Sequence, residues 1–248
     1  MNNDEVINLS NADERESFFN SPDAFINESD LLIVGLPVYF DKIPKFFSKS
    51  FAEVNGNGKL AIAIVVYGNK GAGIGLKQLV TMLDKNDFKV VGVASFIGEH
   101  SLSSEFPIAL GRPDDNDMTL ARGFGKAIHD SLGTLNEVHA EDVPGQRDVL
   151  LRITPEIPPK PKTDLEKCDH CGICVQFCPM GIIDWETKIY KNKSAENLCL
   201  GCMSCVKNCP RGAKSVDLSP VLKYLTGKLF LNEAMKYRKE PYTYIKQS

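Results

Sequence analysis

Cysteine is missing from residues 1–167 and 210–248 of this 248-residue chain. No apolar run approaches the roughly 20 residues that a membrane-spanning helix needs, so the sequence predicts no association with a membrane. The opening segment, MNNDEVINLS, is polar, so we expect no secretory signal peptide. The sequence also shows no Ser/His/Asp, paired-carboxylate or Cys/His arrangement of the kind that nucleophilic or acid–base catalysis uses.

The net charge of −3 conceals a difference between the two parts of the chain. Residues 1–143 contain 12 Lys and Arg against 21 Asp and Glu, whereas residues 144–248 contain 17 against 11. The end of the chain, 218–248, has six Lys and Arg and two acids. A basic tail can bind nucleic acid, but this one has no dense run of positive charge. We therefore interpret it as a solvated helix face that docks on the acidic part, and we expect no nucleic-acid partner.

The eight cysteines form two copies of one pattern, in which gaps of two, two and three residues separate them and a proline follows the fourth. Every position of the first copy recurs 31 residues later in the second. The copies are Cys168, Cys171, Cys174, Cys178 and Pro179, then Cys199, Cys202, Cys205, Cys209 and Pro210. Val175 and Gly181 recur at the same offset as Val206 and Gly212. The offset indicates a duplicated unit.

Two residues between cysteines let a loop wrap so that three thiolates converge on one cluster. The pattern resembles that of the bacterial two-cluster ferredoxins, in which the cysteine after the three-residue gap binds the other cluster. This resemblance implies two [4Fe–4S] clusters and single-electron transfer. One cluster would take Cys168, Cys171, Cys174 and Cys209, and the other would take Cys199, Cys202, Cys205 and Cys178. Each proline after a crossed cysteine suits the first turn of a short helix.

Cysteines at this spacing have two other uses in proteins. Paired Cys-x2-Cys patterns also bind zinc, but a zinc site has four ligands and leaves the two Cys-Pro pairs unexplained. Disulfides require an oxidising compartment. Eight reduced cysteines and exposed low-potential clusters favour the cytoplasm. His170 lies between two ligand positions, and we interpret it as an exposed loop residue rather than an iron ligand.

Three short, β-branched and apolar runs within residues 1–143 predict parallel strands that are covered on both faces. They are residues 30–38, 60–66 and 89–96, and the helices predicted between and after them are residues 44–54, 74–85 and 117–132. Alternating strands and helices indicate an α/β layer. Such a layer binds ligands at the carboxyl ends of its strands.

The loops after these strands resemble those of flavodoxin-like proteins. Gly35–Tyr39 with Ile43-Pro44 is similar to the flavin-facing loop after the third strand, and Val66–Gly71 is similar to the loop after the fourth. With residues 95–101 and 111–117, the order resembles a subfamily in which a flavodoxin-like domain is fused to a two-cluster ferredoxin. This resemblance implies FMN as a further cofactor, with ring contacts from Pro37, Tyr39, Tyr67, Gly68 and Asn69.

The beginning of the sequence departs from that family. Flavodoxin-like domains open with a strand and a Ser/Thr- and Gly-rich loop whose amides hold the flavin phosphate, and no such segment precedes Asp30. The early candidate strand, Glu5–Leu9, resembles the second strand instead. Because the first strand is central in the 2-1-3-4-5 order, its loss would give strand 30–38 an open apolar edge. Either Glu5–Leu9 fills that place or the segment lies upstream, and we expect FMN to bind weakly or not at all.

Two other motifs have plainer interpretations. The glycine-rich run Gly68–Gly75 matches neither a dinucleotide fingerprint nor a Walker loop, so we interpret it as a flexible turn. Arg112 with Asp114 and Asp117 predicts a salt-linked turn and a helix cap rather than a catalytic set.

The predicted architecture has four parts. They are a truncated α/β flavodoxin-like domain (1–143), a proline-rich linker (144–161), an α+β two-cluster ferredoxin domain (162–217) and a basic helical tail (218–248). The predicted function is electron transfer to or from a redox partner protein, as an electron carrier or an oxidoreductase component. The alternative is a cluster-containing redox sensor or docking protein that binds no flavin.

Overall fold

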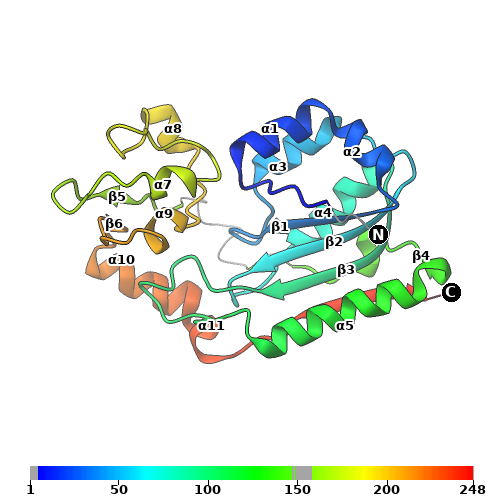
Figure 1. Cartoon of the computed structure of the whole chain (residues 1–248). Coiled ribbons are helices and arrows are strands. Elements are labelled where there is room, and N and C mark those ends of the chain that lie inside the picture. Colours follow the sequence, from blue (N-terminus) through cyan, green and yellow to red (C-terminus); the bar gives the residue numbers. More distant parts are fainter. Residues whose placement is uncertain (1–4, 147, 149–157, 248) are drawn as a thin grey trace. The chain divides into compact units, whose positions relative to one another are not determined.

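The computed structural model describes residues 5–146, 148 and 158–247, and Figure 1 shows the chain. Most of the predicted proline-rich linker therefore lies outside the described residues. The cysteines all lie in one of two compact units, each of which combines two separate segments of the chain.

The division differs from the boundaries that the sequence predicts. The cysteine unit contains Met1–Ser21 as well as Ile157–Leu225. The α/β unit contains Pro22–Glu156 and Thr226–Ser248. The segment before Pro22 therefore groups with the cysteines, and the end of the chain groups with the α/β layer, because each forms its contacts there.

The α/β unit is built on a mixed sheet with the strand order β1-β2-β3-β7-β4. Its first three strands are parallel and confirm the three predicted strands: β1 (Leu31–Pro37), β2 (Leu60–Tyr67) and β3 (Lys89–Ile97). Strand β7 (Tyr242–Gln247) pairs antiparallel with β3, and β4 (Leu135–Asn136) pairs antiparallel with β7 at the end of the sheet. The sheet therefore joins a parallel half from the early sequence to a strand from the end of the chain.

Helices lie on both faces of this sheet, as the apolar strands predict (Figure 1). Helix α5 (Asp115–Ser131) covers one face, where Phe124 and Ile128 pack on Ile62 and Ala94. Gly92 permits this close approach, because a Cβ there would lie 2.4 Å from the Ile128 side chain. The other helical elements are α2 (Pro22–Glu28), α3 (Lys45–Ser50) and α4 (Gly75–Lys85), with 3-10 turns at Phe51–Glu53, Leu132–Thr134 and Ala140–Asp142.

Strand β1 is the last strand on its side of the sheet among the described residues, as the sequence predicts. One face of the strand is in the core, where Leu32, Val34 and Leu36 are buried. On the opposite face Ile33 is 64% exposed. The apolar edge is therefore open in the described part of the chain.

The predicted early strand at Glu5–Leu9 is wrong. No strand forms there, and the segment turns into helix α1 (Ala12–Asn20) of the cysteine unit. The Asn8 side chain accepts a hydrogen bond from the Ser10 amide at 3.0 Å, and the Asn11 side chain caps the helix. Such local side-chain bonds compete with an extended strand.

The prediction of a helical tail at residues 218–248 is only partly right. The tail begins with α10 (Pro220–Leu225), continues through a π-helical segment (Thr226–Leu231) and α11 (Asn232–Lys236), and ends in β7. Pro241 cannot continue a helix, and the β-branched and aromatic residues after it favour a strand. Two basic side chains of the tail dock on acids of the α/β unit, as predicted: Arg238 pairs with Asp114 and Lys246 pairs with Asp142.

The predicted salt-linked turn and helix cap at Arg112 are confirmed. Asp114 and Asp117 form a reciprocal capping box at the start of α5. The buried guanidinium of Arg112 donates to both carboxylate oxygens of Asp117, with Nε 2.7 Å from Oδ2. It also donates to the carbonyl of Lys239 at 2.7 Å. The hydrogen bond from Arg112 holds the pKa of Asp117 below its usual range.

The cysteine unit has little regular structure. Its elements besides α1 and α10 are β5 (Lys162–Thr163), α7 (Ile173–Gln176), α8 (Lys193–Asn197), α9 (Ser204–Lys207) and β6 (Lys214–Ser215). The antiparallel pair β5–β6 ties the two ends of the cysteine segment together. Among the described residues of the whole chain, no helix has the length and apolar composition needed to cross a membrane.

Candidate metal centre

The two cysteine copies have the same backbone conformation, which supports the predicted duplication. Three positions in each copy have a positive φ, at the same offset that relates the cysteines. The pairs are His170 and Gly201, Gly172 and Met203, and Gly181 and Gly212. Gly172 must lack a side chain, because a Cβ there would lie 2.6 Å from the Trp185 ring. His170 is exposed, as expected of a loop residue.

Backbone hydrogen bonds also repeat between the copies. The amide of Cys178 bonds to the carbonyl of Val175, and the amide of Cys209 bonds to the carbonyl of Val206, both at 3.2 Å. Each cysteine then begins a single turn, in which its carbonyl accepts from the glycine three residues later. The short helices predicted after the Cys-Pro pairs are therefore only turns. The thiols at the ends of α7 and α9 are positioned in the same way.

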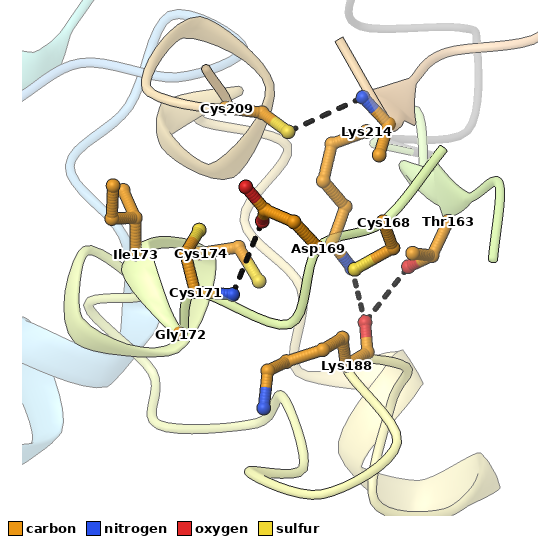
Figure 2. Close-up of a pocket in the computed structure, with 11 residues that line it drawn as sticks. Thr163, Cys168, Asp169, Cys171, Gly172, Ile173, Cys174, Lys188, Cys209 and Lys214 are labelled. Carbon is orange, nitrogen blue, oxygen red and sulfur yellow. Dashed lines mark hydrogen bonds between the residues drawn. The ribbon is translucent and has the colours of Figure 1, made fainter. Parts of the chain in front are cut away.

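The cysteines line two separate pockets, each formed by three members of one copy and the fourth member of the other. The first pocket contains Cys168, Cys171, Cys174 and Cys209 (Figure 2). The second contains Cys199, Cys202, Cys205 and Cys178. The structure thus brings together the two crossed sets that the spacing predicts.

Each of the two pockets is lined by four thiols, and both pockets are partly open to solvent. Within the described ranges, no three His, Cys, Asp or Glu side chains have the spacing of a mononuclear metal site. Four thiols around one pocket fit the donor set of a [4Fe–4S] cluster.

Burial is a main influence on the pKa of several cysteine thiols. It raises the pKa of Cys205 to about 12 and also raises the pKa of Cys174 and Cys202. Burial acts in the same direction on Cys209, but the backbone amides of residues 211–214 hold its pKa below the usual value. A bound iron would supply the positive charge that keeps the buried sulfurs deprotonated. Metal binding and thiolate formation are thus coupled here.

Hydrogen bonds to sulfur occur in both pockets. In the first, the Ala213 amide donates to Cys209 Sγ at 3.3 Å. In the second, the Tyr190 hydroxyl donates to Cys199 Sγ at 3.5 Å, and burial raises the pKa of that hydroxyl. Donors of this kind adjust the reduction potential of a cluster.

The residues that line the pockets also differ in charge. The first pocket includes Lys188, Lys214 and Asp169. The second has no charged residue among its lining residues in the described chain, which beside the cysteines are Pro161, Pro179, Met180, Ile182, Ile183, Tyr190, Leu200 and Met203. The cysteine pattern alone does not point to Lys214 or Tyr190, but Lys214 occupies the position that Ile183 has in the first copy.

The residues predicted to contact a flavin lie together at the carboxyl ends of the parallel strands. Pro37 ends β1 and Tyr67 ends β2 beside it, with Pro37 in register with Val66. Tyr39 follows β1, and Gly68 and Asn69 follow β2. The structure therefore brings the five predicted residues to the carboxyl ends of two adjacent parallel strands.

Two of these residues are already engaged by the chain itself. The buried Asn69 amide donates to the carbonyls of Ala234 and Tyr237, both at 2.8 Å, and its oxygen accepts from the Lys239 amide at 2.9 Å. Gly68 lies against His100, where a Cβ would come within 2.6 Å of the ring. A flavin contact from the Asn69 amide would require these three hydrogen bonds to be given up.

Comparison with known proteins identifies the cysteine segment. Residues 167–213 match the family described as "4Fe-4S dicluster domain". Over 51 residues the chain is 41% identical to "Pyruvate synthase subunit PorD" of Methanothermobacter marburgensis. That similarity covers 21% of this chain and 57% of the relative, so the chain spans little more than half of the relative's length. Both similarities support an iron–sulfur electron-transfer function for the cysteine segment.

Proposed function

We propose that this protein relays single electrons through two [4Fe–4S] clusters. Cys168, Cys171, Cys174 and Cys209 would hold the first cluster, and Cys199, Cys202, Cys205 and Cys178 the second. The observation that carries this proposal is the pair of separate pockets, each lined by four cysteines from both copies. A [4Fe–4S] cluster supplies one-electron chemistry at a potential that the surrounding protein adjusts.

The protein's own contribution is to position and adjust the clusters. Backbone amides and the Tyr190 hydroxyl donate to sulfur, which stabilises a reduced and therefore more negative cluster. Cys174 is buried, whereas the other seven cysteines are at least partly exposed. The repeated turns would hold both clusters within one small unit, and the clusters would supply one-electron transfer without a change in bonding.

The test is the iron, acid-labile sulfide and flavin content of protein prepared without oxygen. Two complete four-thiolate sets predict about eight iron and about eight sulfide per chain. About four iron per chain with an intact fold, or zinc in place of iron, would overturn the two-cluster proposal.

We propose that the α/β unit docks a redox partner rather than binding FMN tightly. The parallel order β1-β2-β3 supports the resemblance to flavodoxin-like domains, whereas strand β7, which is antiparallel to β3, departs from it. The Asn69 amide, one of the predicted ring contacts, is saturated by the end of the chain. An FMN phosphate also needs several charge-assisted hydrogen bonds, each worth about 1.5–3 kcal/mol, and no phosphate loop was predicted.

FMN titration tests this part, with a flavin-binding protein of known affinity as the positive control. We expect no binding at micromolar FMN. Sub-micromolar affinity would show that another segment, such as Gly68–Gly75, holds the phosphate.

The partner is proposed to be an oxidoreductase of the cell interior, because the chain resembles a protein named as a pyruvate synthase subunit over the cysteine segment. A nucleic-acid-binding sensor is disfavoured, because Arg238 and Lys246 of the basic tail pair with Asp114 and Asp142. Salt-dependent binding of the holoprotein to duplex DNA would reverse this preference.

A further inference from the structure

Lys214 is a buried cation in the wall of the first cysteine pocket. It lies in β6, its side chain is 5% exposed, and its Nζ donates to the carbonyl of Lys188 at 2.6 Å. Figure 2 shows the side chain reaching into the pocket beside Cys168. No carboxylate in the described part of the chain forms an ion pair with it. A buried charge without a partner is costly, so its position needs an explanation.

The duplication shows that a charge is not required at this place by the fold. Lys214 follows Cys209 by five residues, and Ile183 follows Cys178 by five residues. Ile183 is also buried, at 3% exposed, and it lines the second pocket. The same structural position is therefore apolar beside one set of cysteines and cationic beside the other.

The natural counter-charge for Lys214 is the thiolate set itself. Lys214 and the four cysteines of the first set line the same pocket. A [4Fe–4S] core held by four thiolates has a net negative charge, and reduction adds one electron to it. An adjacent ammonium therefore favours the reduced form of the cluster.

The other charged groups at this pocket do not cancel the effect. Asp169 is paired with Arg211 at 2.9 Å, so its negative charge is compensated. Lys188 is a second buried cation in the wall, and its ammonium lies 4.8 Å from the centre of the Trp185 ring. The balance at the first pocket is positive, whereas the residues lining the second are uncharged.

We propose that Lys214 raises the reduction potential of the cluster held by Cys168, Cys171, Cys174 and Cys209 above that of the other cluster. This inference rests on the proposed pair of clusters. The first reducing electron then resides on the first cluster, and the second cluster is the stronger reductant. Lys214 acts only through its positive charge near the cluster, and no bond forms or breaks when the electron moves.

The test is a redox titration of the holoprotein with dithionite, followed by paramagnetic resonance. The variant Lys214→Ile places in the second copy the residue that the first copy already has. We expect the higher of the two midpoint potentials to fall by at least a tenfold change in the reduction equilibrium constant, which is about 59 mV for a one-electron couple. The lower midpoint potential should change less.

Two matched variants separate charge from packing. Lys214→Arg keeps the charge and should retain most of the wild-type separation between the midpoints. Ile183→Lys places a positive charge in the wall of the second pocket and should raise the lower midpoint potential. Unchanged midpoints in Lys214→Ile, or an equal shift in Lys214→Arg, would overturn the inference. If Lys214→Ile fails to load iron, the Ile183→Lys variant is the test instead. An unchanged lower midpoint potential in Ile183→Lys would also overturn the inference.

The iron content of the wild-type protein separates the two proposals. One cluster per chain would refute the proposed two-cluster relay itself. Two clusters with midpoints that do not respond to residue 214 or 183 would refute only the role of Lys214.

Discussion

Asn69 and Lys239 are 170 residues apart in the sequence, yet the side-chain oxygen of Asn69 accepts a hydrogen bond from the Lys239 amide at 2.9 Å. Two further bonds from the same side chain reach the carbonyls of Ala234 and Tyr237. The loop after β2 is thereby tied to the segment between α11 and β7. This link completes the α/β unit with residues that follow the cysteine segment in the chain.

Asn69→Ala should loosen that link. The substitution leaves two carbonyls and one amide without their partner in a largely buried place, which should cost roughly 2–4 kcal/mol. We expect faster amide hydrogen exchange in β7, because its connection to the β2 loop is lost. The exposed Asn116→Ala is the matched control and should leave the exchange of β7 unchanged. Equal protection of β7 in wild type and Asn69→Ala would contradict this assignment.

Asp117 should make the α/β unit sensitive to acid. Its pKa is lowered in the folded protein, so it contributes stability above the unfolded pKa of about 3.9, and that stability is lost as the pH falls through the folded pKa. Asp117→Ala breaks the buried pair with Arg112, which should cost about 3–5 kcal/mol at neutral pH.

Urea unfolding between pH 2 and pH 7 measures this effect. The variant should have a flatter dependence of the unfolding free energy on pH than wild type. Asp130→Ala removes an exposed carboxylate from the same helix and should have little effect. Parallel pH profiles for wild type and Asp117→Ala would show that the pair does not govern acid stability.

The sequence predicts most features that depend on local pattern. The strands β1, β2 and β3 were found because each is a continuous apolar run, whereas the crossed cysteine sets rest on the resemblance to the two-cluster ferredoxins. The capping box at Asp114 and Asp117 is also a pattern within four residues.

Features that depend on distant partners were missed. The β-branched and aromatic residues of β7 favour a strand, but its place in the sheet depends on pairing with β3, which is far away in the sequence. Glu5–Leu9 has suitable residues for a strand, but local bonds at Asn8 and Asn11 decide otherwise. Lysine is normally a surface residue, so the burial of Lys214 could be expected only from its alignment with Ile183.

Crossed ligation predicts which pairs of cysteines act together. In Cys178→Ala with Cys202→Ala, both losses fall on the second cluster, so the first cluster should remain. In Cys178→Ala with Cys171→Ala, each cluster loses one ligand, so neither should remain intact. Iron content and paramagnetic resonance of the reduced proteins distinguish the two double variants. The reverse outcome would show that each copy binds its own cluster.

Cluster removal should unfold the cysteine unit and leave the α/β unit folded. The cysteine unit has few large buried apolar side chains, and two of its largest, Phe177 and Trp185, are more than half exposed. A domain with so small a core depends on its metal for stability. Helix α1 should be released as well, because the buried Arg15 holds it by donating to the carbonyl of Pro179 at 2.6 Å.

Hydrogen exchange of the protein before and after anaerobic chelation of iron measures this directly. We expect loss of protection in residues 12–20 and 162–217, together with retained protection in β1, β2 and β3. Arg15→Ala in the iron-loaded protein is the matched control, and it should release α1 alone while the cysteine segment stays protected. Protection of residues 162–217 that persists without iron would show that side-chain packing, and not the metal, holds this unit together.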